Sequence, residues 1–296
     1  MTRLNAYIPV NMTLLNLNRI WGEAYRTELV QDVSDIPEIR DWFSVFSELD
    51  GDYYWSVIAG PSLTLINDTV PTGTATAYCE FMYWGDRYVP LWEIWGAEFP
   101  AQALYEAAGT SSTEDDLALM REVLAGDDLM LFSNGDDVGL GYTGSDELRG
   151  FDGNDVLRGG SGSDLLIGNA GADRLYGGEH KDTLSGNRGA DSLYGRAGRD
   201  VLQGGRGNDV MIGGSHADRF IFNDGDGRDV VRDFTDDVDT LVLDSDLWEG
   251  DLYRIQVINR YAEVVDGATL LDFGEEQITL AGFDDLDALR NDIEIA

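Results

Sequence analysis

The chain has 296 residues, which is enough for two or three structural units with a substantial core. It carries 56 acidic residues against 20 Lys and Arg, and a formal net charge of -36 argues against nucleic acid and anionic membranes as partners. Cys79 is the only cysteine, so an internal disulfide is excluded, and no apolar run is long enough for membrane insertion or a cleavable signal peptide.

Residues 1–122 are rich in tryptophan and other aromatic residues, which predicts a globular domain with its own core, of α+β class. Within residues 36–49, Ile36, Ile39, Phe43 and Phe46 recur at helical spacing, so a helix is predicted there. Segments rich in β-branched and aromatic residues predict three or four antiparallel strands. These are residues 52–59, 63–67, 73–83 and 87–95. Two further helices are predicted over residues 100–108 and 113–124.

This first domain contains no histidine, which excludes a Ser-His-Asp or Cys-His nucleophile and an HExxH zinc site. Cys79 lies in an alternating run and is interpreted as a buried core thiol. Two alternatives stay open for the rest of the domain. A carboxylate pair could cleave glycosides, or aromatic residues could bind a sugar or a surface protein rather than fill the core. The carboxylates are Glu80, Asp86, Glu93 and Glu98; the aromatics are Tyr83, Trp84, Tyr88, Trp92 and Trp95.

A nine-residue pattern then repeats eleven times over residues 123–221 without insertion or deletion. The last nine repeats read GYTGSDELR, GFDGNDVLR, GGSGSDLLI, GNAGADRLY, GGEHKDTLS, GNRGADSLY, GRAGRDVLQ, GGRGNDVMI and GGSHADRFI, after the rougher VLAGDDLML and FSNGDDVGL. Glycine at the first and fourth positions is expected to supply the backbone angles of a tight turn. The last three residues predict a short strand whose apolar eighth residue faces inward, so stacked repeats bury a continuous apolar column.

The sixth position is aspartate in every repeat. If two repeats make one coil, aspartates eighteen residues apart stack along the same edge at about 4.8 Å. Unpaired carboxylates at that spacing repel, and a divalent cation between them removes the repulsion. Calcium fits best because it accepts six to eight oxygen ligands in flexible geometry. One predicted ladder is Asp128, Asp146, Asp164, Asp182, Asp200 and Asp218; the other is Asp137, Asp155, Asp173, Asp191 and Asp209. We expect about eight calcium ions between successive rungs.

The repeats resemble the parallel β-roll of the RTX (repeats-in-toxin, hemolysin-type) calcium-binding family. The resemblance implies export in unfolded form by a type I secretion system through an uncleaved carboxyl-terminal signal. It also implies folding on meeting calcium outside the cell, so the expected location is extracellular or at the cell surface.

His180 and His216, the only histidines, replace the fourth-position glycine two coils apart on one edge. They are interpreted either as tolerated turn variation or as a pH-sensitive or metal-binding pair.

Residues 222–296 are predicted to form a β-rich cap that covers the open end of the roll. The repeat register slips by two residues near Asp224, after which Asp229 takes the sixth position as a further metal ligand, with Val231 as its apolar partner. The run from Gly227 to Leu243 resembles the GxDxIxDFxxxxDxIxL segment that closes RTX rolls. Strands are predicted over residues 253–258, 262–265, 268–273 and 277–281, and a short helix over residues 286–293.

The sequence therefore predicts a mainly β protein divided as 1–122, 123–221 and 222–296. The leading functional hypothesis is a secreted calcium-binding module that is non-catalytic and acts in adhesion or at a surface. The alternative is an exported carbohydrate-active hydrolase or lyase whose site lies in residues 1–122. A pore-forming toxin is disfavoured, because no apolar membrane-inserting region is present.

Overall fold

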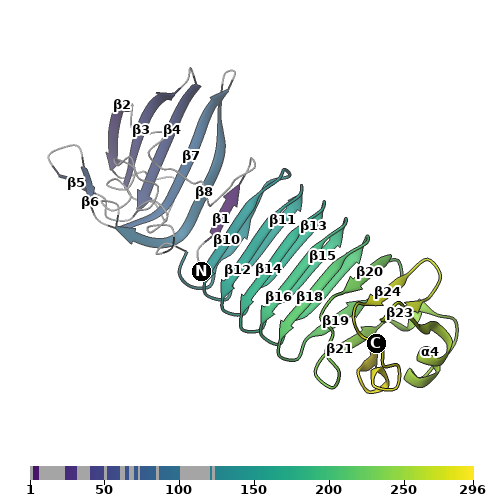
Figure 1. Ribbon diagram of the computed structural model, residues 1–296. Helices are drawn as coiled ribbons and strands as arrows, with labels where there is room; N and C mark the ends of the chain where they lie inside the picture. The colour runs from purple at the N-terminus through teal and green to yellow at the C-terminus, as the bar shows by residue number, and fades with distance from the viewer. Residues whose placement is uncertain are drawn as a thin grey trace. The chain divides into compact units, whose positions relative to one another are not determined.

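The computed structural model describes residues 3–6, 24–31, 41–49, 52–60, 64–66, 70–72, 74–84, 87–100, 121 and 124–296 (Figure 1). The chain divides into two compact units, Met1–Ser133 and Asn134–Ala296. The division into three domains at residues 122 and 221 stays a prediction.

The first unit contains an antiparallel sheet in the order β2-β3-β4-β7-β8-β1, followed by β9, which is parallel to β1. A separate two-stranded hairpin pairs β5 with β6. The strands are β1 (Arg3–Ala6), β2 (Ala24–Gln31), β3 (Asp41–Leu49), β4 (Asp52–Gly60), β5 (Thr64–Ile66), β6 (Val70–Thr72), β7 (Thr74–Trp84), β8 (Arg87–Pro100) and β9 (Leu129–Leu131).

The helix predicted over residues 36–49 is wrong, because β3 occupies Asp41–Leu49 and pairs along its whole length with β4. Leu49 and Asp52 are opposite each other, and the two residues between them are Asp-Gly, a dipeptide typical of two-residue hairpin loops. That signal and the aromatic content of β3 outweigh the helical spacing. The four predicted strands are confirmed as β4, β5, β7 and β8, whereas residues 101–108 and most of 113–124 lie outside the described residues.

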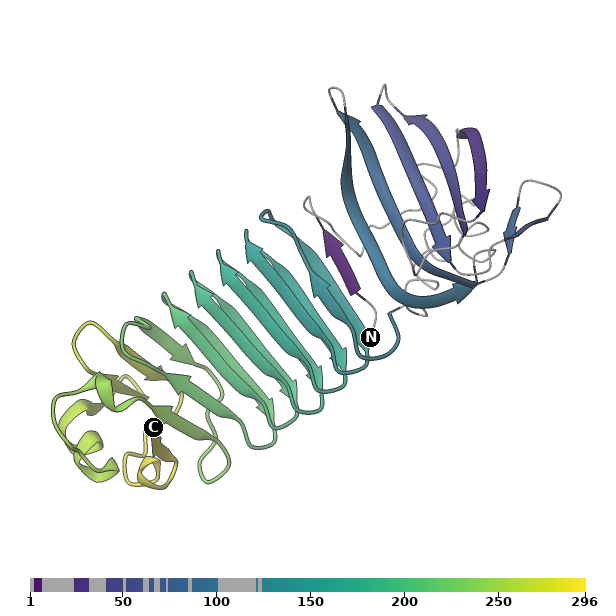
Figure 2. The ribbon, with the colours of Figure 1, turned by 180° about the vertical axis from the view of Figure 1, so that it is seen from behind.

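The second unit is a parallel β-roll made of two sheets (Figures 1 and 2). Even-numbered strands from β10 to β20 form one sheet, and odd-numbered strands from β11 to β21, followed by β25, form the other. The strands are β10 (Val138–Thr143), β11 (Glu147–Asp152), β12 (Val156–Ser161), β13 (Leu165–Ala170), β14 (Arg174–Glu179), β15 (Thr183–Arg188), β16 (Ser192–Ala197), β17 (Val201–Arg206), β18 (Val210–Ser215), β19 (Arg219–Phe222), β20 (Arg228–Val231) and β21 (Thr240–Leu243).

Each nine-residue repeat supplies one strand, and each strand pairs with the one eighteen residues further on. Leu166 lies opposite Leu184 in one sheet, and Leu175 lies opposite Leu193 in the other. The predicted eighteen-residue coil is therefore confirmed. The strands are longer than the predicted three residues, because pairing continues through the first three positions of the next repeat.

The predicted apolar column is buried, and it consists of two columns, one from each sheet. The eighth-position side chains from Leu148 to Phe220 are all fully shielded from solvent. Burying each such side chain contributes roughly 1.5–3 kcal/mol, so the stability of the roll accumulates coil by coil.

The glycines of the turns have roles that differ in part from those predicted from the sequence. Fourth-position glycines such as Gly171 have the positive φ (139°) that was predicted, but the other positive φ falls at the second position, as at Asn169 (79°). First-position glycine is needed for space. A Cβ on Gly168 would stand only 2.2 Å from Oδ2 of Asp173, so any larger residue would displace the carboxylate.

The chain after the repeats closes the roll with aromatic packing and an antiparallel extension. Phe234 packs 6.3 Å from Phe220 and edge-on to Phe283 at 5.2 Å between ring centroids. The even-numbered sheet continues through β24 (Gln277–Leu280), β23 (Ala268–Asp272) and β22 (Ala262–Val265), and the odd-numbered sheet ends at β25 (Ile293–Ile295). This confirms the predicted cap.

Two elements predicted in this tail are wrong. Residues 253–258 are not a strand, because the helix α4 spans Arg254–Tyr261, with Tyr253 as its N-cap and the Gln256 side chain accepting a hydrogen bond from the Tyr253 N–H. The helix predicted over residues 286–293 shrinks to the 3-10 turn η3 (Leu289–Asn291), because Ile293 begins β25. A further 3-10 turn, η2 (Ser245–Leu247), follows β21.

Candidate calcium-binding edges

Two rows of aspartates run along the two edges of the roll, where the turns lie. We call edge 1 the row Asp146, Asp164, Asp182, Asp200, Asp218 and Asp239, and edge 2 the row Asp137, Asp155, Asp173, Asp191, Asp209 and Asp229. Every one of these side chains is at most 5% exposed. Asp128 was also predicted as a ligand. It is buried in the first unit and is not counted in either edge.

One oxygen of each carboxylate has a structural role that the sequence did not reveal. The backbone N–H of Asp155 donates to Oδ1 of Asp173 at 2.8 Å, and the N–H of Asp173 donates in turn to Oδ1 of Asp191. The same bond links all successive members of both edges at 2.7–2.9 Å. The side chain of one coil thus satisfies the backbone of the preceding coil.

The second oxygen, Oδ2, is buried and has no hydrogen-bond partner in eight of these residues. They are Asp155, Asp164, Asp173, Asp182, Asp191, Asp200, Asp209 and Asp218. It points to the first-position glycine of its own repeat, where a backbone carbonyl of the next coil also converges. A Cβ on Gly186 would be 2.3 Å from Oδ2 of Asp191 and 2.6 Å from the carbonyl oxygen of Gly204. An unpaired buried anionic oxygen is costly, so something must compensate it.

The pKa values of the buried aspartates also indicate that their negative charge needs compensation. Burial, and secondarily the neighbouring rungs, raise the pKa of Asp182 and Asp191 from 3.8 to about 7, against the lowering effect of the backbone hydrogen bond. The pKa of Asp155, Asp209 and Asp218 is likewise raised to about 7. Without a compensating cation, these carboxylates therefore resist ionisation at neutral pH.

The donor set fits calcium. The convergent atoms are carboxylate and backbone carbonyl oxygens, the hard ligands that Ca²⁺ prefers, and within residues 134–296 no thiol and no imidazole ring belongs to the two rows. A cation between rungs would compensate Oδ2 while leaving the Oδ1 hydrogen bond in place. When bound, calcium would supply charge neutralisation and cross-linking of adjacent turns.

The sequence predicted the register position of Asp229 but not that of Asp239. The predicted two-residue slip is confirmed, because the N–H of Asp209 donates to Asp229 twenty residues on. Edge 1 continues in the same way, since the N–H of Asp218 donates to Oδ1 of Asp239 at 2.9 Å. The signal was present in the run Asp239-Thr240-Leu241, which repeats the aspartate-x-apolar order of positions six to eight.

His180 and His216 occupy fourth positions of edge 1, each with a positive φ that glycine supplies elsewhere in the roll. Burial raises the pKa of Asp164 and Asp200, and the backbone hydrogen bond that each accepts, followed by the charge of His180 or His216, partly opposes that rise. Among the other candidates, Cys79 is paired in register with Glu93, and Glu80 with Trp92, across β7 and β8. Asp86 lies outside the described residues.

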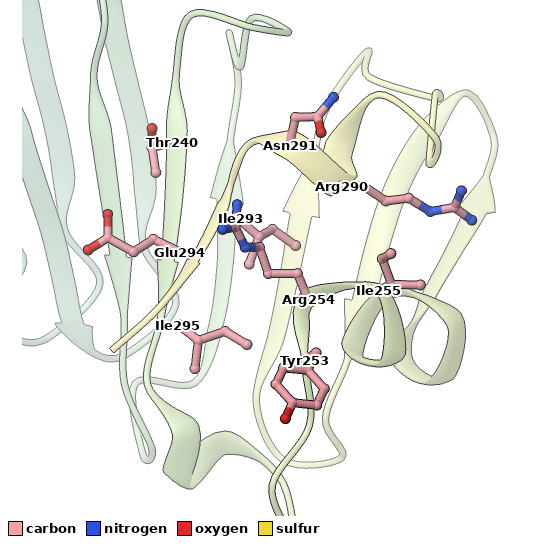
Figure 3. Close-up of a pocket in the computed structure, with 9 residues that line it drawn as sticks. All are labelled: Thr240, Tyr253, Arg254, Ile255, Arg290, Asn291, Ile293, Glu294 and Ile295. Carbon is pink, nitrogen blue, oxygen red and sulfur yellow. The ribbon is translucent and has the colours of Figure 1, made fainter.

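The cap contains a cavity of about 810 Å³ between α4 and β25 (Figure 3). Arg254 reaches from α4 towards β25, and Tyr253 and Ile255 stand beside it. The one carboxylate in its lining, Glu294, is held by Arg219 at 2.8 Å, and Arg290 pairs with Asp287 at 2.6 Å. The lining therefore offers no pair of carboxylates for acid–base chemistry. Over the described residues, no helix has the length and apolarity needed to cross a bilayer.

Comparison with known proteins agrees with this geometry. A parallel roll of nine-residue repeats with buried oxygen-lined edges defines a calcium-binding β-roll. The family described as RTX calcium-binding nonapeptide repeat (4 copies) matches residues 133–166, 158–193 and 194–229. Residues 133–229 of the chain therefore match the repeats of this RTX family.

Two solved structures are also similar. One is the extracellular lipase LipA from Serratia marcescens, with 20% identity over 58% of this chain and a TM-score of 0.32; the chain spans 38% of that lipase. The other is the AlgE6R3 subunit of the Azotobacter vinelandii mannuronan C5-epimerase, with 29% identity over 43% of this chain and 80% of that one, and a TM-score of 0.35. No curated protein matches the chain in sequence.

Proposed function

We propose that this protein is a secreted calcium-binding RTX module whose roll folds when the two edges bind extracellular Ca²⁺. The ligands are the edge aspartates from Asp137 to Asp239, together with Asp128, and the backbone carbonyls that converge with them. About eight ions lie between the rungs from Asp137 to Asp218, and the last rungs, Asp229 and Asp239, extend each edge by one interval.

The observation that carries the proposal is the buried, unpaired Oδ2 repeated along both edges. A ligand that binds only the folded state stabilises it by mass action, and extracellular calcium modules bind at about 10⁻⁴–10⁻³ M. At low calcium the edges destabilise the roll; at millimolar calcium they hold it together. The protein therefore remains export-competent inside the cell and folds outside, which suits type I secretion.

The first unit is proposed to act as a binding or adhesive part delivered by the roll. Its antiparallel sheet carries the aromatic residues Tyr83, Trp84, Tyr88, Trp92 and Trp95 on β7 and β8, a residue type suited to sugars and protein surfaces.

The experiment is a calcium titration of the full chain followed by far-ultraviolet circular dichroism and calorimetry. We expect a cooperative gain of β-structure near millimolar calcium, several ions bound per chain, and reversal by a chelator. Magnesium serves as the control, because it demands a tighter octahedral geometry. An identical folded roll in chelator and in calcium would refute the proposal.

A further inference from the structure

The outer face of the even-numbered sheet carries a second feature, unrelated to the calcium edges. Ninth-position side chains point outward there, and register places Arg158, Tyr176 and Tyr194 side by side on β12, β14 and β16. The two tyrosine rings stack with centroids 4.7 Å apart and planes within 9°. The guanidinium carbons of Arg158 and Arg196 lie 5.0 and 5.2 Å from the centroid of the Tyr176 ring.

A hollow of about 430 Å³ opens beside this group; we call it the tyrosine–arginine hollow. Gly160 and Gly178 form part of its floor and place no side chain in the hollow. Glycine is required at Gly178, where a Cβ would stand 2.0 Å from the carbonyl oxygen of Gly160. Ser161 and Glu179 form another part of the lining, with the Ser161 hydroxyl 3.4 Å from the Glu179 carboxylate. The volume falls in the usual range for small-molecule sites.

The two arginines are available for a ligand. Among residues 134–296, no ion pair joins Arg158 or Arg196 to a carboxylate, in contrast to Arg219 and Arg290 of the cap. The chain has a net charge of -36, so two guanidinium groups near one aromatic ring, neither of them in an ion pair, are an exception to its acidic character. Guanidinium groups bind carboxylate and sulfate oxygens through charge-assisted hydrogen bonds.

The other residues that line the hollow restrict which class of ligand can bind there. The Glu179 carboxylate is an acceptor and would repel an anion placed against it, but it accepts hydrogen bonds from hydroxyl groups. A ligand must therefore present a negative group to the arginines and hydroxyl donors to Glu179. The tyrosine rings and the flat glycine floor suit a ring with an apolar face. An acidic peptide provides the charge but lacks this set of hydroxyl groups.

We propose that the tyrosine–arginine hollow is a binding site for an acidic saccharide, one that carries a carboxylate or a sulfate group. The anionic group contacts Arg158 and Arg196, the sugar ring packs beside Tyr176, and its hydroxyls donate to Glu179. This site is independent of the calcium ligands and lies on a face that exists only when the roll is folded.

The test is isothermal titration calorimetry of the full chain in millimolar calcium with four probes of equal length. These are trigalacturonate, a sulfated galactotriose, neutral galactotriose and triglutamate. We expect binding of one or both charged sugars, which identifies the anionic group, and at least about tenfold weaker binding of the neutral sugar and the peptide. Binding of triglutamate as strong as that of the charged sugars would overturn the saccharide assignment.

The decisive variant is R158Q/R196Q, which should weaken binding of the charged sugar by about tenfold or more. The matched control is R188Q/R206Q, which removes the same two charges from exposed positions on the odd-numbered sheet. Circular dichroism in calcium checks that each variant is folded. The single variant Arg196→Gln, at an exposed position, replaces the double variant if the latter does not fold. Equal affinity in the wild type and the folded arginine variants would rule the site out.

Discussion

Eight of the edge aspartates, between Asp155 and Asp218, use their two oxygens for different purposes. Oδ1 accepts the N–H of the preceding rung, so it keeps adjacent turns in register. Oδ2 is buried without a hydrogen-bond partner, so it is the oxygen that a cation would compensate. The two functions can be separated, because asparagine retains a carbonyl acceptor but lacks the anionic oxygen.

We predict that Asp173→Asn has opposite effects with and without calcium. In millimolar calcium it removes an anionic ligand and should lower the free energy of unfolding by about 3 kcal/mol, with a reduced ion count. In chelator it removes a buried uncompensated charge and should raise the fraction of the roll that is folded. Urea unfolding in calcium and far-ultraviolet circular dichroism in chelator measure the two effects.

The matched control is Asp152→Asn, which removes the same charge from an exposed third position of the roll. It should leave the calcium stoichiometry unchanged and shift stability by less than about 0.5 kcal/mol in either condition. The separation of roles is contradicted if Asp173→Asn destabilises the protein equally in calcium and in chelator.

At the scale of the element, the pH dependence of the calcium-free roll follows from its buried carboxylates. The pKa of Asp155 and Asp191 rises to about 7 from 3.8 because of burial, so between these values the folded roll binds more protons than the unfolded chain. Their stabilising contribution is complete below pH 3.8 and is lost as pH rises through about 7. We predict more β-structure at pH 5 than at pH 8 in chelator, measured by circular dichroism.

Calcium should reverse this order, because the cation competes with protons for the same carboxylates. In millimolar calcium, where the roll is folded, the urea midpoint at pH 8 should exceed that at pH 5. A chelator-treated protein that is more stable at pH 8 would show that these aspartates do not control the stability of the roll.

The closing element of the roll depends on one aromatic side chain. Phe234 is 7% exposed and lies between Phe220 of the last regular coil and Phe283 of the cap. We predict that Phe234→Ala costs about 3–5 kcal/mol through the cavity it leaves. Thermal unfolding in calcium measures the loss. Phe151→Ala, at a 37% exposed position, is the control and should cost much less.

The roll was predictable from sequence because one strong local rule repeats: the aspartate, the glycine and the apolar residue of each nonapeptide all require the same geometry. The failures fall where short segments carry competing signals. Over residues 36–49 the helical spacing of four apolar residues competed with an Asp-Gly hairpin signal, and the pairing of β3 with β4 across that hairpin decided the outcome. In α4 the alternation over residues 253–258 competed with the capping interaction of Tyr253 and Gln256.

Positions on the outer face escaped prediction for a different reason. The pattern fixes what faces inward, but Arg158, Tyr176 and Tyr194 occupy a position that the repeat leaves free. Their proximity appears only once the eighteen-residue register is known. Asp239 was missed because its spacing from Asp218 departs from the repeat by three residues.

At the scale of the whole molecule, the two units should respond differently to calcium removal. The edge aspartates all belong to the second unit, whereas the first unit contains Asp128 of the predicted ligands and has a hydrogen-bonded antiparallel sheet. We predict that trypsin in chelator degrades the arginine-rich roll and leaves a fragment ending at Arg121 or Arg149. In millimolar calcium the roll should be protected. Equal digestion of both units in chelator would show that the first unit also depends on calcium.

Because each strand pairs with the strand eighteen residues further on, the register also limits how the number of repeats in the roll can change. Removing or adding one nonapeptide would pass every later strand to the opposite sheet, so that the strand entering the cap would meet the wrong partner. Removing or adding two returns each strand to its own sheet and changes the roll by one coil, about 4.8 Å. The number of repeats can therefore change in steps of two without altering the strand pairing at either end of the roll.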